Sequence, residues 1–127
     1  MDVIPTLRYR DADAAVAFLT DAFGFAEHEI FRGEDGTVVH AELRFGDGMI
    51  MLGADRPQGA ELNADVGGSS VYCILDEVDE HYARAVAAGA TILRDLEEAS
   101  YGGTGYTARD PEGNRWSFGS YRPAARG

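Results

Sequence analysis

An internal duplication constrains the fold of this chain more than any other sequence feature. Asp11 and Asp76, Gly24 and Gly89, and Gly48 and Gly113 each lie 65 positions apart. Repeated spacing of capping and turn residues indicates that one structural unit occurs twice. We interpret the 127 residues as a single domain of two modules, residues 1–53 and 69–121, with a linker at 54–68 and a tail at 122–127.

Each module shows the pattern of one strand, one helix and three further strands. Alternating apolar residues predict strands at 3–9, 25–31, 37–45 and 49–52 in the first module, and at 70–75, 91–96, 107–109 and 115–118 in the second. Asp11 or Asp13 can cap the first helix and Gly24 can end it; Asp76 and Gly89 are the equivalents in the second. The sequence DPEGN at 110–114 predicts a tight turn. The expected fold class is α+β, with two βαβββ modules.

The strand pattern also predicts which residues face a cleft. A βαβββ unit buries one sheet face beneath its helix and leaves the other face open. Alternation places Leu7, Tyr9, Ala41, Leu43, Val71, Cys73 and Leu75 on the helix side. The predicted cleft residues are Ile4, Thr6, Arg8, His40, Glu42, Arg44, Met49, Met51, Tyr72, Ile74 and Ser117, with Tyr106 and Trp116 as further aromatic candidates. Arg8 would be neutralised by Glu42 or Asp11, or would bind a ligand.

Charge and hydropathy limit the partners of the chain. It has 22 acidic and 11 basic residues and a formal net charge of -11, which repels nucleic acid and anionic membrane surfaces. Neither a long apolar run nor a signal-peptide pattern occurs, so we expect a cytoplasmic protein. The single cysteine, Cys73, lies in an apolar run and is predicted to be a buried structural thiol.

Four segments resemble one known family. They are VIPTLRYRDADAAVAFL with the following FGF, HAELRFGDGMIML, VYCILDEVDEHYARAVAAGA and YTARDPEGNRWSF. They are similar to the glyoxalase / bleomycin-resistance / extradiol-dioxygenase superfamily, also called the vicinal oxygen chelate superfamily. The resemblance implies a half-barrel around a small-molecule cavity, usually in a homodimer. The superfamily includes metal-dependent enzymes as well as metal-free proteins that bind antibiotics.

The positions that carry metal ligands in the enzymes of this superfamily correspond by motif to Ile4, Met51, Ser70 and Ser117. None of these side chains is an ordinary ligand for a divalent ion, so no metal or other cofactor is expected. Among the three histidines, His28 and His81 are expected to be exposed, whereas His40 shares a strand face with Glu42.

The leading hypothesis is a metal-free protein that binds a small organic molecule, such as an antibiotic or a toxic metabolite. The predicted ligand-binding residues are Arg8, Thr6, His40, Met51, Tyr72, Tyr106 and Ser117. One alternative is an enzyme, either a metal-dependent lyase, isomerase or dioxygenase with displaced ligands, or a metal-free acid–base catalyst that uses His40 and Glu42. Another is a structural or partner-binding domain without a ligand.

Overall fold

The computed structural model describes residues 3–55, 66–100 and 102–123. The first module contains β1 (Thr6–Tyr9), α1 (Ala12–Phe23), β2 (Ala26–Arg32), β3 (Val38–Phe45) and β4 (Gly48–Ala54). The second contains β5 (Ser70–Ile74), α3 (Val78–Ala87), β6 (Thr91–Glu98), β7 (Thr104–Arg109) and β8 (Arg115–Gly119). This order confirms the α+β class and the two βαβββ modules. Most of the predicted linker and the end of the tail lie outside the described residues.

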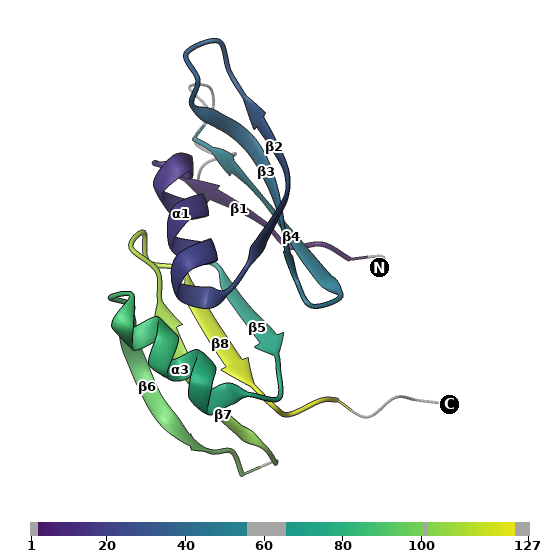
Figure 1. The fold of residues 1–127 in the computed structure, drawn as a ribbon, viewed down its shortest axis with the longest axis vertical. Helices are drawn as coiled ribbons and strands as arrows, with labels where there is room; N and C mark the ends of the chain where they lie inside the picture. The colour runs from purple at the N-terminus through teal and green to yellow at the C-terminus, as the bar shows by residue number, and fades with distance from the viewer. Residues whose placement is uncertain (1–2, 56–65, 101, 124–127) are drawn as a thin grey trace.

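The eight strands form two separate sheets of four. Their strand orders are β1-β4-β3-β2 and β5-β8-β7-β6, so the first and last strands of each module are neighbours. Those neighbours pair in parallel, with Thr6 opposite Met51 in one sheet and Tyr72 opposite Ser117 in the other. The remaining strand pairs are antiparallel. The sheets follow one another along the long axis of the molecule, with α1 and α3 on the same side (Figure 1).

The ends of α1 follow the sequence prediction. The Asp11 carboxylate accepts a hydrogen bond from the Ala14 amide at 3.0 Å, and Gly24 ends the helix with a φ of 78°. In α3 the prediction was wrong by one residue, because Glu77 occupies the N-cap position and makes no capping bond through its side chain. Asp76 instead accepts a hydrogen bond from Arg122 at 3.2 Å. In the described part of the chain, neither α1 nor α3 is long and apolar enough to cross a membrane.

The two modules are joined through the helix sides of their sheets. Phe23, at the end of α1, packs against Trp116 and Phe118 of β8, with ring centroids 6.0 and 4.8 Å apart. All three side chains are fully buried. Burial of large apolar side chains from both modules in one cluster holds the modules together. Within the residues that the structure describes, no helix covers the opposite face of either sheet.

Polar contacts between α1 and α3 complete this junction. The Nε2–H of His81 donates to the Phe23 carbonyl at 2.7 Å, and its Nδ1 accepts from the Tyr106 hydroxyl at 2.6 Å. Arg84 donates to the carbonyls of Thr20 and Asp21 at 2.9 Å each. These bonds satisfy carbonyl groups at the end of α1 that have no partner within the helix.

Burial lowers the pKa of His81, although the bond to the Phe23 carbonyl opposes that shift. The prediction that His81 is exposed was wrong, because this face of α3 packs against the first module.

Candidate functional site

The open face of the first module carries polar side chains in two rows. Strand register places Thr6, Met51 and Glu42 side by side, and Arg8, Gly53 and His40 in the next row. Residues directly opposite in a sheet point to the same face. The structure therefore brings together five predicted residues on this face, which are Thr6, Arg8, His40, Glu42 and Met51.

Glu42 lies between two histidines. Its carboxylate is 3.1 Å from His40 Nε2 and 4.0 Å from His28 Nε2, and the side chains are 26%, 36% and 46% exposed for Glu42, His40 and His28. His28 is exposed, as predicted. An imidazole within hydrogen-bond distance of a carboxylate can accept or deliver a proton while the carboxylate holds its tautomer. This pair of residues is the best-placed acid–base group on the open face of the first module.

Arg8 lies flat on its own sheet. Its Nη1 donates to the Ala54 carbonyl at 3.4 Å, and a Cβ atom added at Gly53 would overlap with the guanidinium. A side chain at position 53 would therefore displace Arg8.

The open face of the second module is lined by hydroxyl groups. The hydroxyls of Ser117 and Thr107 are 2.8 Å apart, and the Tyr72 hydroxyl donates to the Tyr121 carbonyl at 2.7 Å. Tyr72 passes over Gly119, where an added Cβ would lie 2.8 Å from the tyrosine oxygen. Tyr72 and Ser117 therefore share this face, as the alternation predicted.

Tyr106 does not belong to that face. It is fully buried on the helix side, where its hydroxyl bonds to His81 and its ring packs on Phe118 at 5.3 Å. Burial raises its pKa. The assignment of Tyr106 to the cleft is corrected by the strand register, which pairs Tyr106 with Phe118 and Thr107 with Ser117. This pairing could have been predicted from the sequence, because residues at equal distances on either side of the DPEGN turn lie opposite one another and point to the same face. Trp116 is also fully buried.

The positions that correspond to metal ligands in the superfamily enzymes hold no metal-binding side chains, even when they are reassigned from the observed pairing of the strands. Met51 lies opposite Thr6 rather than Ile4, and Ser117 lies opposite Tyr72 rather than Ser70. Neither arrangement supplies an imidazole or a carboxylate, which divalent ions prefer. Within residues 3–55, 66–100 and 102–123, no three His, Cys, Asp or Glu side chains meet in an arrangement that could hold a metal ion.

A groove of about 500 Å³ runs between the two modules. Its walls come from the N-terminal segment, the β3–β4 turn, the edge of β5 and the segment after β8. We call it the inter-module groove; it is lined by Val3, Pro5, Phe25, Phe45, Gly46, Asp47, Gly48, Met49, Ile50, Val71, Tyr72, Cys73, Ile74 and Arg122. Of the seven predicted ligand-binding residues, only Tyr72 lines it. The shape of the groove depends on how the two modules dock. The alternation of residues within each strand, on which the prediction was based, does not contain this information.

Cys73 is buried, as predicted. Its burial raises the thiol pKa to about 12, so the side chain stays protonated at neutral pH. A protonated thiol is a poor nucleophile, and Cys73 contributes to the groove as a small apolar wall residue.

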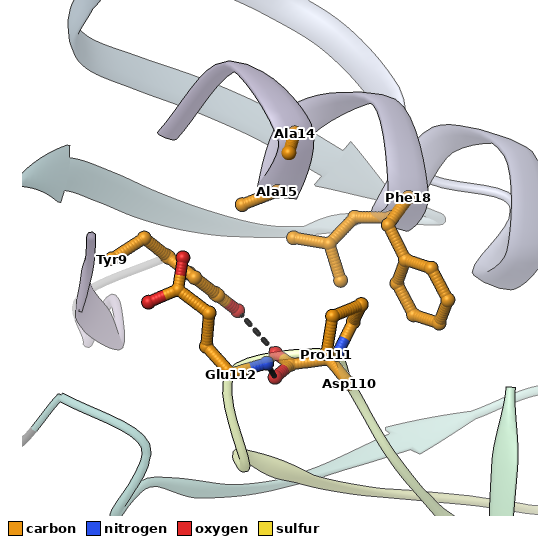
Figure 2. Close-up of a pocket in the computed structure, with 8 residues that line it drawn as sticks. Tyr9, Ala14, Ala15, Phe18, Asp110, Pro111 and Glu112 are labelled. Atoms are coloured by element: carbon orange, nitrogen blue, oxygen red, sulfur yellow. Dashed lines mark hydrogen bonds between the residues drawn. The ribbon is translucent and has the colours of Figure 1, made fainter. Parts of the chain in front are cut away.

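The DPEGN turn connects the modules on the side of the N-terminus of α1. Figure 2 shows Asp110, Pro111 and Glu112 facing Tyr9, Ala14, Ala15 and Phe18 around a cavity of about 30 Å³, which is no larger than a water site. Asp110 accepts a hydrogen bond from the Tyr9 hydroxyl at 2.6 Å, and burial beside this carboxylate raises the pKa of Tyr9. Glu112 accepts bonds from the amides of Arg10 and Asp11 at 2.6 and 2.8 Å. The turn is therefore a structural clamp between modules.

Comparison with known proteins identifies the family. The model of the Glyoxalase/Bleomycin resistance protein/Dioxygenase superfamily matches residues 4–118. The chain belongs to this superfamily. That result confirms the resemblance of the four sequence segments.

Individual proteins are similar to this chain over nearly its whole length. An uncharacterized protein of Mycobacterium tuberculosis (strain ATCC 25618 / H37Rv), Rv0887c, is 34% identical over 121 residues, which cover 91% of this chain and 71% of that protein. The crystal structure of TioX from Micromonospora sp. ML1 is 31% identical with a TM-score of 0.79, covering 96% of this chain and 99% of TioX. A bleomycin-binding protein complexed with bleomycin is 23% identical with a TM-score of 0.67, covering 96% and 99% of the two chains, and shares the fold.

Proposed function

We propose that this superfamily member binds a small organic molecule in the inter-module groove, without a metal ion. The observation that carries the proposal is the groove itself. Its volume of about 500 Å³ falls within the range of about 300 to 1,000 Å³ that is typical of ligand pockets. Phe25, Phe45 and Tyr72 offer aromatic surface, and Met49 can adapt to an irregular shape. Asp47 and Arg122 provide one charge of each sign.

Two further observations support binding without metal chemistry. The positions that would carry the metal ligands hold apolar or hydroxyl side chains, whichever register is used. A bleomycin-binding protein complexed with bleomycin has the same fold, so the fold can hold an organic ligand. We therefore expect reversible sequestration, with an antibiotic or another toxic metabolite as the ligand, in a cytoplasmic protein.

A thermal-shift and calorimetric screen tests this proposal. Bleomycin and a panel of aromatic antibiotics are titrated in the presence of EDTA and again with added Zn²⁺ or Mn²⁺. A bound ligand raises the melting temperature and is recovered unchanged. Tyr72→Ala and Met49→Ala should each weaken binding by about tenfold, because each removes a contact surface in the groove. Val39→Ala is the matched control, since Val39 is an exposed apolar residue that does not line the groove.

Binding that is abolished by EDTA and restored by a stoichiometric divalent ion would contradict the metal-free proposal. If no compound of the panel raises the melting temperature, the inter-module groove is not a high-affinity site for these classes of molecule.

A metal-free acid–base enzyme is the second candidate function, and the contact between His40 and Glu42 at 3.1 Å favours it. In that case the ligand would be converted rather than returned unchanged. His40→Gln would then reduce kcat by about a hundredfold or more and leave ligand binding intact, as expected for removal of a general base. Equal turnover in wild type and His40→Gln would exclude this role.

A further inference from the structure

The open face of the second module carries two complete rows of hydrogen-bond donors. Strand register across β5, β8, β7 and β6 defines the rows. The first is Ser70, Arg115, Arg109 and Thr91, and the second is Tyr72, Ser117, Thr107 and Arg94. Their strand neighbours Trp116 and Ala108 are buried on the helix side, so these eight residues lie on the opposite face. We call this surface the donor face.

The charges of the donor face are unusual for this chain. Acidic residues outnumber basic ones by 22 to 11, yet neither row contains a carboxylate. Arg109 and Arg115 lie directly opposite one another, an arrangement in which like charges destabilise a sheet. In the part of the chain that the structure describes, neither side chain makes an ion pair. Arg94 is the exception among the three arginines, since it pairs with Glu97 at 3.0 Å.

We propose that the donor face binds the oxyanion group of a small molecule: a phosphate, sulfate or carboxylate. The guanidinium groups of Arg109 and Arg115 supply planar, bidentate donors that match such groups. Ser70 and Thr91 flank them in the same row and can donate through their hydroxyls. The hydroxyls of Ser117 and Thr107 form one hydrogen bond with each other. The hydroxyl that accepts this bond keeps its own hydrogen, which can be donated to the ligand.

The first module does not offer the same chemistry. The row that corresponds to Arg109 and Arg115 contains Arg44 and Met49, and therefore one arginine in place of two. The row that corresponds to Tyr72, Ser117, Thr107 and Arg94 contains Thr6, Met51, Glu42 and Glu29, so that two carboxylates occupy the face. These carboxylates would repel an anion, whereas the donor face would attract it. The opposed pair of arginines therefore distinguishes the second module from the first, although both modules have the same order of strands and helix. It goes beyond the proposed function, because it requires no occupant in the inter-module groove.

NMR titration of the ¹⁵N-labelled full chain tests this inference, with phenyl phosphate, phenol and inorganic phosphate as separate probes. We expect phenyl phosphate and inorganic phosphate to shift the amides of residues 70, 91, 109 and 115. Phenol should not shift these amides, since it lacks the oxyanion. Added NaCl should weaken the binding, as screening predicts.

The double variant Arg109→Gln with Arg115→Gln should bind phenyl phosphate about tenfold more weakly, because charge-assisted bonds are lost. The matched control is Arg10→Gln with Arg44→Gln, which also removes two exposed arginines. Arg44 lies on the open face of the first module, beside Met49. The control should bind within about twofold of wild type, since these guanidiniums lie outside the donor face.

Equal affinity in the double variant and wild type would overturn the inference, and so would identical amide shifts with phenol and phenyl phosphate. Circular dichroism establishes that each variant is folded. If the double variant does not fold, the single variants Arg109→Gln and Arg115→Gln replace it, and each should weaken binding by about threefold. Wild-type affinity in both single variants would equally contradict the proposal.

Discussion

Asp110 accepts five hydrogen bonds although it is almost completely buried. Its donors are the Tyr9 hydroxyl, the Trp116 indole N–H, the Asn114 side-chain amide, and the backbone amides of Glu112 and Asn114. Its exposed fraction is 2%. A buried carboxylate is tolerated when donors satisfy its oxygens, and here the donors come from both modules.

Replacing Asp110 with Ala should lower the free energy of unfolding by about 3 kcal/mol, because the Tyr9 hydroxyl and the Trp116 N–H lose their acceptor in the core. Urea denaturation of both proteins measures the change. Asp21→Ala removes an exposed carboxylate and should change stability by less than about 0.5 kcal/mol. A loss for Asp110→Ala no greater than that of the control would refute the importance of this network.

His81 should make stability depend on pH. Its pKa in the folded protein lies below the ordinary value of 6.5, mainly because of burial. The unfolded chain therefore binds a proton more readily than the folded chain. This contribution to stability is complete above pH 6.5 and is lost as the pH falls toward the folded pKa. Denaturant unfolding between pH 5 and 8 should show a smaller pH dependence in His81→Gln than in wild type. His28→Gln is the control; if it flattens the curve equally, His81 is not the responsible group.

At the scale of elements, the DPEGN turn holds the start of α1. The carboxylate of Glu112 accepts both backbone amides that precede the helix, those of Arg10 and Asp11. A helix start has amide groups without partners inside the helix, and a carboxylate there is favourable for the helix dipole. A side chain of the second module thus performs a capping role for the first.

Glu112→Ala should therefore cost about 1 to 2 kcal/mol of unfolding free energy, which is the usual effect of losing a helix cap. Thermal denaturation followed at 222 nm measures the change. Glu34→Ala, in the β2–β3 loop, removes an exposed glutamate that makes no side-chain hydrogen bond in the described structure, and it serves as the control. Identical melting temperatures for the two variants would show that Glu112 does not stabilise α1.

Much of the element order could be predicted from the sequence, because local signals encode it. The first helix has a capping Asp11 and a terminal Gly24, and both occupy the expected positions. The strand ends at β1 and β7 were less accurate: β1 begins at Thr6 rather than Val3, and β7 begins at Thr104 rather than Thr107. Strand ends depend on the length of the paired neighbour, which a single strand does not encode.

The site was less predictable than the elements. Alternation correctly placed His40 and Glu42 on one face, because pleating depends on neighbours along the chain. Tyr106 and His81 were misplaced, since their environment comes from packing between α3, α1 and β8. Of the predicted cleft residues, Met49, Tyr72 and Ile74 line the inter-module groove. Its other walls were not predicted, because they come from segments that meet only when the modules dock.

At the scale of the whole molecule, the modules pack through their helix sides, and neither α1 nor α3 covers the open face of a sheet (Figure 1). We propose that the protein is a homodimer in solution, in which a second copy adds surface beside these faces. Size-exclusion chromatography with light scattering should then give about twice the chain mass of 13.7 kDa at micromolar concentration. A mass of one chain at all concentrations would contradict the dimer.

Trp116 gives this junction an optical signal. It is the only tryptophan of the chain, it is fully buried, and its ring packs 5.4 Å from Phe25 of the first module and 6.0 Å from Phe23. Its emission spectrum therefore reports the contact between modules rather than the state of either sheet. In a rapid-mixing unfolding experiment, a red shift of the fluorescence that precedes the loss of circular dichroism would reveal separated but still folded modules. Simultaneous changes would show that the two modules unfold as one cooperative unit.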